Sequence, residues 1–309
     1  MKKFPILKLP LLATEEVLKQ LSIRDIYPLS TCSKRCSKMI SLAHTRKYTL
    51  DIKPWLSSLF QLKVDHFDLT IPKDEKKRNS RDPKFIDNMF EELKTEFSHL
   101  LTTFKFHQKN FVSSETWTPE QNQLLLETII REQGNRFEDV TLSSNYRDMS
   151  NQLIVENIEV NNILTISASL PQKGFIFKYC PKILRSIYSS WITIDTLISL
   201  GTCKAIELHM ATLFTIKEIN SLMEMWKADK FPNLEYLYLG DLKWKDNEMI
   251  LGFTREQLSV RSENWRKKKI SSKRYHCFGG VDIQSNGGVN GTLNFEVFFK
   301  SVSFFVWKD

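Results

Sequence analysis

Cysteine and histidine are the residue types in this sequence that could bind a metal or act as a nucleophile, and their spacing decides what chemistry is open to the chain. Cys32 and Cys36 are four residues apart, which would place two thiols on one face of a helix. A zinc site needs about four ligands close together, and the nearest histidine is His44. The pair is more consistent with helix packing, so no metal site is predicted.

The other cysteines and histidines are dispersed and match no catalytic or metal-binding spacing. They are Cys180, Cys203 and Cys277, with His66, His99, His107, His209 and His276. The glycine-rich residues 279–288 lack the Lys and Ser/Thr of a phosphate-binding loop, and their glycines are typical of turns. The sequence therefore predicts a protein that is not an enzyme and that needs no cofactor.

The composition is that of a globular protein from a reducing compartment. Of 309 residues, 41% are hydrophobic and 26% are charged. No apolar run approaches the roughly 18 residues of a membrane span, and the first residues do not resemble a secretory signal. Five scattered cysteines argue against a disulfide framework. We therefore expect a cytoplasmic or nuclear protein that does not enter a membrane.

A net charge of +8 would permit binding to nucleic acid or to acidic protein surfaces. The densest basic clusters are Lys73–Arg81 and Arg266–Arg274, both in segments expected to be loops. A solvated surface is the simplest interpretation of these clusters, with a nuclear-import signal or an RNA contact as alternatives. Nucleic acid is not the expected partner.

The first 40 residues contain more apolar side chains than a unit of that size can bury. Pro10, Ser22 and Ser33 divide the stretch into three short helical pieces, because Pro and Ser favour helix starts. Units this small usually need a disulfide, a metal or a partner to be stable. A binding partner is the favoured explanation.

Strands and amphipathic helices alternate through the next two hundred residues. Apolar residues alternate with polar ones in segments 64–71, 101–108, 137–144, 162–170, 183–191, 204–213 and 233–242. Apolar residues at helical spacing mark segments 86–97, 124–130 and 216–226, and Thr215 with Glu218 matches a capping box. Such alternation gives either a doubly wound sheet or a strand-helix solenoid, and the absence of a glycine-rich phosphate loop favours the solenoid.

The C-terminal residues change character. A polar, helix-like stretch at residues 254–265 precedes the basic run, and five of the ten glycines lie between Gly279 and Gly291. Asn286-Gly287-Gly288 is a hairpin-turn signal between residues 281–284 and 293–299. We expect a small antiparallel sheet that caps the end of the solenoid.

The opening stretch resembles the F-box. The matching residues are Leu9-Pro10, Val17-Leu18, Leu21, Asp25-Ile26, Leu29-Ser30 and Cys32-Ser33-Lys34-Arg35. Two positions differ from the family pattern: Cys36 replaces a common aromatic residue, and Pro28 falls within the second helix.

The remainder of the chain resembles the type 2 F-box-associated domain of the large nematode F-box families. Residues 189–238 carry this resemblance through the Trp191-Ile192-Thr193 step, Met225-Trp226 and Pro232–Leu237. The tail adds Arg274-Tyr275, Gly279-Gly280, Asp282-Ile283, Asn286-Gly287 and Phe305-Val306-Trp307.

Together the two resemblances imply an α+β or α/β chain with an F-box at residues 4–43, a connector at 44–60 and an F-box-associated domain at 61–309. Within that domain we expect an irregular, leucine-rich-repeat-like solenoid at about residues 61–245 and a helix with a β cap at about 246–309.

The resemblances also imply a role as the substrate-recognition subunit of an SCF-type ubiquitin ligase. The F-box would bind a Skp-type adaptor, and through it a cullin-RING ligase, while the C-terminal domain would bind a protein target. The predicted adaptor contacts are Leu9, Pro10, Val17, Leu18, Ile26 and Leu29. The predicted target contacts are His209, Tyr236 and Tyr238, at alternate strand positions that could face the concave side of a solenoid. A basic repeat protein that binds nucleic acid and a non-ligase scaffold are the alternatives.

Overall fold

The structure is a computed structural model of the 309-residue chain. It describes residues 9–43, 47–55, 59–65, 67–71, 83–113, 118–142, 155–168, 170, 173–245 and 247–308. The predicted basic loop Lys73–Arg81 and the first residues of the predicted F-box lie outside the described residues. The chain divides into two compact units, residues 1–137 and 138–309, which are considered separately below.

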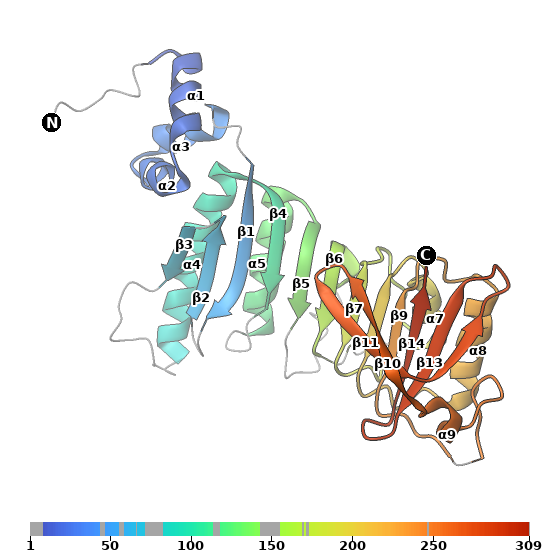
Figure 1. The fold of residues 1–309 in the computed structure, drawn as a ribbon. Coiled ribbons are helices and arrows are strands. Elements are labelled where there is room, and N and C mark those ends of the chain that lie inside the picture. Colours follow the sequence, from blue (N-terminus) through green and yellow to red (C-terminus); the bar gives the residue numbers. More distant parts are fainter. Residues whose placement is uncertain are drawn as a thin grey trace. The chain divides into compact units, whose positions relative to one another are not determined.

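The first unit begins with three short helices at the positions predicted from Pro10, Ser22 and Ser33. They are α1 (Leu11–Gln20), α2 (Ile23–Thr31) and α3 (Lys34–Ala43) (Figure 1). The Ser33 hydroxyl accepts a hydrogen bond from the Cys36 backbone N–H, which satisfies a donor in the first turn of α3. Pro28 does not end α2, which continues to Thr31.

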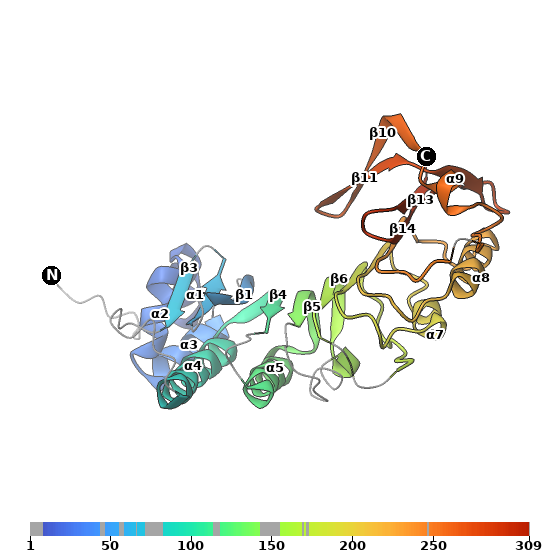
Figure 2. The same ribbon diagram turned by 90° about the horizontal axis from the view of Figure 1, so that it is seen from below.

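A mixed sheet with two helices forms the rest of the first unit. Its elements are β1 (Lys47–Trp55), β2 (Leu59–Val64), β3 (Phe67–Ile71), α4 (Pro83–Thr103), β4 (Lys105–Val112) and α5 (Pro119–Gln133). The strand order is β4-β1-β2-β3, with β1 parallel to β4 and antiparallel to β2. Helices α4 and α5 cover one face of this sheet (Figures 1 and 2). The capping box of Thr118 and Gln121 begins α5, where an N-cap and a first-turn proline were predicted.

Several sequence-based boundaries differ from this arrangement. In the segment predicted as a strand at 101–108, residues 101–103 end α4, and β4 begins at Lys105. The strand predicted at residues 64–71 is a hairpin, in which Asp65 turns with a φ of 51° between β2 and β3. Strand β1 begins at Lys47, so part of the predicted connector is a strand of the sheet. The compact units divide the chain at residues 137/138 and not near residue 60, and the extent of the two domains stays a prediction.

The second unit contains the predicted run of strands and helices. Its elements are β6 (Glu159–Ile166), β7 (Ile183–Ser186), α7 (Ile194–Ser199), β8 (Ala205–Leu208), α8 (Ile216–Lys227) and β9 (Tyr236–Leu239), preceded by β5 (Arg136–Leu142). Strands β6 to β9 are parallel and follow one another in chain order. A doubly wound sheet would reverse its order at a switch point, and these strands do not. The solenoid itself stays a prediction.

The C-terminal strands extend this sheet with antiparallel pairs, and two predictions there need correction. The elements are α9 (Arg255–Leu258), β10 (Arg261–Ile270), β11 (Lys273–Gly279), β12 (Val281–Gln284), β13 (Asn290–Glu296) and β14 (Ser301–Trp307). Strand β14 pairs with β9, and the predicted turn at residues 286–288 joins β12 to β13. The predicted helix at 254–265 is a helix only at 255–258. The basic run predicted as a loop lies mostly in the antiparallel pair β10–β11.

The two faces of the second unit's sheet are covered differently. Helices α7 and α8 lie on one face (Figure 2). On this face the Trp226 ring packs edge-on against Phe304, with centroids 4.6 Å apart. The β10–β11 pair, called the ribbon from here on, lies on the other face. No helix among the described residues is both long enough and apolar enough to cross a membrane.

Candidate protein-interaction surfaces

The residues predicted to contact an adaptor differ sharply in exposure. Leu18 and Ile26 are fully buried inside the first unit. Pro10 is exposed, and Leu9, Val17 and Leu29 are half-buried. The buried pair therefore stabilises the three helices, while the remaining four are accessible to a partner. Adaptor contact by any of them stays a prediction.

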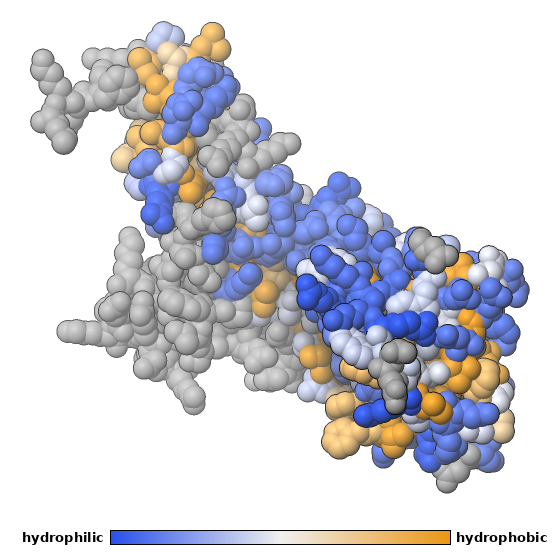
Figure 3. Space-filling model, in the orientation of Figure 1, coloured by the Kyte–Doolittle hydropathy of each residue, from blue (hydrophilic) through white to orange (hydrophobic). Residues whose placement is uncertain are grey.

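Two leucines on these helices lie outside the predicted set and are largely exposed. Leu12 on α1 is 77% exposed and Leu42 on α3 is 67% exposed. Leaving a leucine side chain in water forgoes about 1.5–3 kcal/mol of burial. Leu42 was not predicted as a contact. It follows the buried Ile40 by two residues, so in an α-helix its side chain points away from the core that the helix packs against. Figure 3 shows hydrophobic residues gathered at the surface of these helices.

Helices α2 and α3 are held against α4 by three polar contacts. The Tyr27 hydroxyl donates to the Glu96 carboxylate, the Ser30 hydroxyl lies 2.9 Å from His99 Nε2, and the Ser37 and Thr103 hydroxyls are 2.8 Å apart. Burial and the bond to Glu96 raise the pKa of Tyr27 above its usual value. These contacts fix α2 and α3 on α4.

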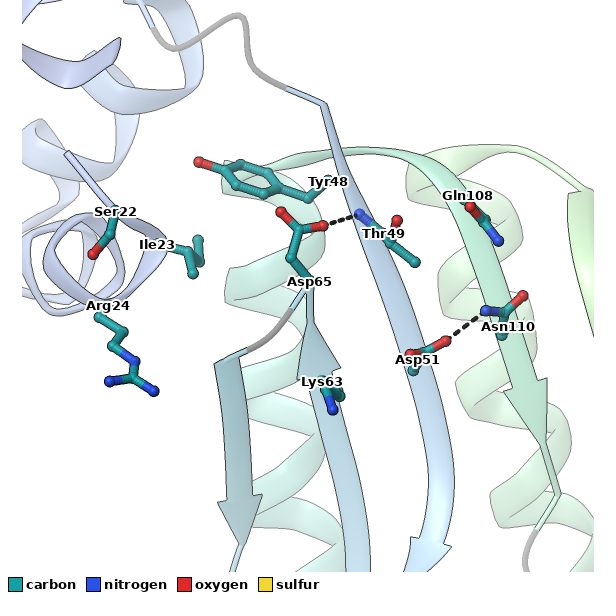
Figure 4. Close-up of a pocket in the computed structure, with 10 residues that line it drawn as sticks. All are labelled: Ser22, Ile23, Arg24, Tyr48, Thr49, Asp51, Lys63, Asp65, Gln108 and Asn110. Carbon is teal, nitrogen blue, oxygen red and sulfur yellow. Dashed lines mark hydrogen bonds between the residues drawn. The ribbon is translucent and has the colours of Figure 1, made fainter. Parts of the chain in front are cut away.

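A cleft of about 710 Å³ lies between α2 and the strands of the first unit. Figure 4 shows that Ile23 and Arg24 border it from the helix side, while Asp51 and Asp65 border it from the strands. The Asp65 carboxylate accepts a hydrogen bond from Thr49 N (2.8 Å), and Asp51 accepts one from Asn110 Nδ2 (2.5 Å). Both acids therefore have a structural role within the sheet, and the cleft suggests no chemistry.

The polar centre of the second unit is Glu207 on β8, which is only 5% exposed. Its carboxylate accepts hydrogen bonds from Arg185 Nε (2.9 Å), Lys273 Nζ (2.6 Å) and the Tyr275 hydroxyl (2.6 Å). Burial alone would raise the pKa of Glu207, but the bonds from Lys273 and Tyr275 and the charge of Arg185 outweigh it and hold the pKa below its usual value. The ionised carboxylate therefore joins β11 to β7 and β8.

Apolar packing between the ribbon and the sheet surrounds this polar centre. Tyr275 of β11 packs on Tyr236 of β9, with ring centroids 4.2 Å apart, and Tyr236 packs on Phe305 at 4.9 Å. Ile270 and Cys277 of the ribbon belong to the same buried cluster. The ribbon thus covers this part of the sheet face, where Glu207 and Tyr236 are buried.

The elements beneath the ribbon repeat a strand-helix unit. Strands β7, β8 and β9 are parallel neighbours, and α7 and α8 each begin with a threonine capping box, at Thr193 and Thr215. Residues 171–239 match the F-box associated family model. This match confirms the resemblance predicted for residues 189–238. It is consistent with an F-box-associated domain protein of the nematode type. No curated protein and no solved structure matches the chain.

The F-box-associated segment, residues 171–239, contains the three predicted target contacts. The exposed His209 and the half-buried Tyr238 lie together, with ring centroids 4.9 Å apart. The part of the His209 ring that is covered by its neighbours loses contact with water, and this desolvation lowers the pKa of His209. Tyr236 is only 8% exposed because the ribbon covers it. Two of the three are thus accessible at the surface, and their contact with a target stays a prediction.

The F-box-associated segment also brings together two cysteines that looked unrelated in the sequence. Cys180 and Cys203 precede the neighbouring strands β7 and β8, and their sulfurs are 3.3 Å apart. The hydrogen bond between the two thiols lowers the pKa of Cys180 to about 7, while the pKa of Cys203 is raised. Within the described parts of the chain, no group of three His, Cys, Asp or Glu side chains could hold a metal ion. The similar offset of both cysteines from their strands was the only signal of this pair.

Proposed function

We propose that the protein is the substrate-recognition subunit of an SCF-type ubiquitin ligase. Helices α1 to α3 would be an F-box that binds a Skp-type adaptor, and the second unit would bind a protein target. The observation that carries the proposal is the match of residues 171–239 to the F-box associated family, in a chain whose residues 4–43 resemble an F-box. The subunit would not be catalytic, because ubiquitin transfer would belong to the cullin-RING part of the ligase, in the cytoplasm or the nucleus.

The exposed surface of the three helices supports this assignment. Leu12 and Leu42 are apolar side chains left in water on a small helical unit, as expected where a partner completes the apolar packing. The contacts of Tyr27, Ser30 and Ser37 with α4 hold the helices in place without using either leucine.

Co-expression of the intact protein with a Skp-type adaptor tests the proposal. We expect the two proteins to co-purify, and we expect the double variant L12D/L42D to lose the adaptor while its thermal unfolding stays close to wild type, because both side chains are already exposed. Leu213→Asp is a matched control, since Leu213 is also exposed but lies in the second unit. A folded protein that binds no Skp-type adaptor would contradict the proposal.

The finer part of the proposal is ligase activity. A complex reconstituted with a cullin-RING pair, ubiquitin and its activating and conjugating enzymes should modify a bound target. Adaptor binding without ubiquitin transfer to any co-purifying protein would instead indicate a non-ligase scaffold.

A further inference from the structure

The inward face of the ribbon carries cations that are neutralised by acids of the sheet. These pairs are Arg266 with Asp282 (2.7 Å), Lys268 with Glu235 (3.4 Å) and Lys273 with Glu207 (2.6 Å). Arg266 and Lys268 also lie over the Trp307 ring, at 4.4 and 5.8 Å from its centroid. The inward cations therefore attach the ribbon to the sheet and leave little charge for a partner.

The outward face has a different composition, because successive strand residues point to opposite faces. Its residues are Trp265, Lys267, Lys269, Arg274, His276 and Phe278. No ion pair with an acid is present for its three cations among the residues that the structure describes. Trp265 is 45% exposed and Phe278 is 47% exposed. An exposed surface of aromatic rings and cations thus lies opposite the anchoring face.

The three outward rings order one another. Trp265 and His276 are near-parallel, with centroids 5.1 Å apart and planes inclined by 19°, and His276 and Phe278 are inclined by 19° at 6.0 Å. Lys267 Nζ lies 4.2 Å from the Trp265 centroid, as in a cation–π contact. Side chains that are ordered before binding lose less entropy when a partner arrives, and Trp and Arg are enriched among the residues that dominate interface energies.

Charge in the second unit is concentrated on the ribbon. Residues 261–274 contain seven Lys or Arg and one acid, whereas the rest of residues 138–309 contain fourteen Lys or Arg and eighteen Asp or Glu. Single-stranded nucleic acid requires a positively charged groove that follows its backbone. The rest of the second unit carries a net negative charge, which would repel a long polyanion that extends beyond the ribbon. A short acidic segment that contacts only the ribbon is therefore favoured.

We propose that the outward face of the ribbon binds an acidic protein segment that carries an aromatic or aliphatic side chain. Lys267, Lys269 and Arg274 meet the carboxylates, and the rings of Trp265 and Phe278 cover the apolar side chain. That this segment belongs to the ligase's target rests on the proposed function. The binding itself does not.

Fluorescence anisotropy with the intact protein tests this surface. The probe is a labelled peptide of Glu and Asp with one Leu and one Trp, and its comparison peptide carries Gln and Asn in place of the acids. At low salt we expect the acidic peptide to bind at least about tenfold more tightly and to weaken as salt rises, since exposed charges are screened. The variant K267E/K269E should lose at least about tenfold in affinity, and Trp265→Ser should also weaken binding.

The matched control is K182E/K217E, which makes the same charge change at two exposed lysines of the second unit outside the ribbon. It should bind the acidic peptide within about threefold of wild type, because the change lies outside the contact surface. The proposal is overturned if the acidic peptide fails to bind, if K267E/K269E binds as well as the control, or if single-stranded RNA binds through these lysines while the peptide does not. Adaptor binding by K267E/K269E distinguishes the two proposals. Peptide binding can fail while the adaptor is still bound, and adaptor binding can fail while the peptide is still bound.

Discussion

The ammonium group of Lys273 lies 2.6 Å from a carboxylate oxygen of Glu207, across the interface between the ribbon and the sheet. The Glu207 side chain is 7% exposed and the Lys273 side chain 38% exposed. The acid is therefore enclosed while one of its cations reaches solvent. Loss of the Glu207 carboxylate would therefore leave donors of the ribbon and the sheet without their acceptor.

Glu207→Ala should destabilise the protein by about 2–3 kcal/mol, because three donors on Arg185, Lys273 and Tyr275 lose a charged acceptor. Urea unfolding measures the change. Glu224→Ala is the matched control, since its pair with Lys227 is exposed and should contribute less than about 1 kcal/mol. Equal losses in both variants would contradict the central role of Glu207.

Stability should also fall in acid because of Glu207. Its pKa in the folded protein is lowered below the usual value of about 4.3, so the unfolded chain takes up the proton first as the pH falls. The contribution is complete above about pH 4.3 and is lost as the pH falls through the folded-state pKa. Urea midpoints measured across this range should depend less steeply on pH in Glu207→Gln. Some dependence should remain, since the pKa values of Glu235 and Asp282 are lowered as well.

Cys180 should be the more reactive partner of the cysteine pair. Its pKa of about 7 gives a substantial thiolate fraction at neutral pH, whereas the pKa of the buried Cys203 is raised. Alkylation by iodoacetamide, followed by peptide mass spectrometry, should show a midpoint near pH 7 for Cys180. Cys203→Ala removes the hydrogen bond and should move the midpoint toward that of an ordinary thiol. An unchanged midpoint would show that Cys203 does not stabilise the thiolate.

Gly279 at the end of the ribbon and Gly280, which precedes β12, should not tolerate a side chain. A Cβ on Gly279 would lie 2.1 Å from the Val260 carbonyl oxygen, and one on Gly280 would lie 2.3 Å from that of Leu293. We expect Gly279→Ala and Gly280→Ala each to cost at least about 2 kcal/mol in urea unfolding. Gly252→Ala is the control, because its φ is also positive but nothing lies within 4 Å of a Cβ there, and it should cost about 1 kcal/mol.

On the three N-terminal helices, buried residues should contribute much more to stability than exposed residues do. Leu18→Ala should destabilise the protein by about 2–5 kcal/mol, because Leu18 is fully buried. Leu12→Ala should change stability by less than about 0.5 kcal/mol, because Leu12 is 77% exposed. Thermal or urea unfolding compares them, and similar losses would mean that Leu12 also contributes to the fold.

Local signals in the sequence predicted the elements that depend on local contacts. Helix α8 begins at the capping box of Thr215 and Glu218, and the turn at residues 286–288 joins two strands, both as predicted. The alternating strand positions were also largely predictable, because burial of one face imposes a period of two.

The ribbon was predicted incorrectly because distant residues determine it. Its inward positions are occupied by cations such as Lys268 and Lys273, so its alternation does not look apolar. These cations can occupy inward positions because Glu235 and Glu207, which lie elsewhere in the chain, neutralise them. Tyr236 is buried because the ribbon packs on it. The alternation of apolar residues in β9 alone could not show which face of the sheet the ribbon would cover.

The alternation of the ribbon has an evolutionary consequence. Residues that attach it to the sheet and residues that point outward occupy separate, interleaved positions of the same two strands. Substitutions at the six outward positions leave the ion pairs of Arg266, Lys268 and Lys273 intact, so recognition can diversify between duplicated copies of such a gene at little cost in folding. Sequence variation confined to every second residue of the ribbon would be the mark of that history.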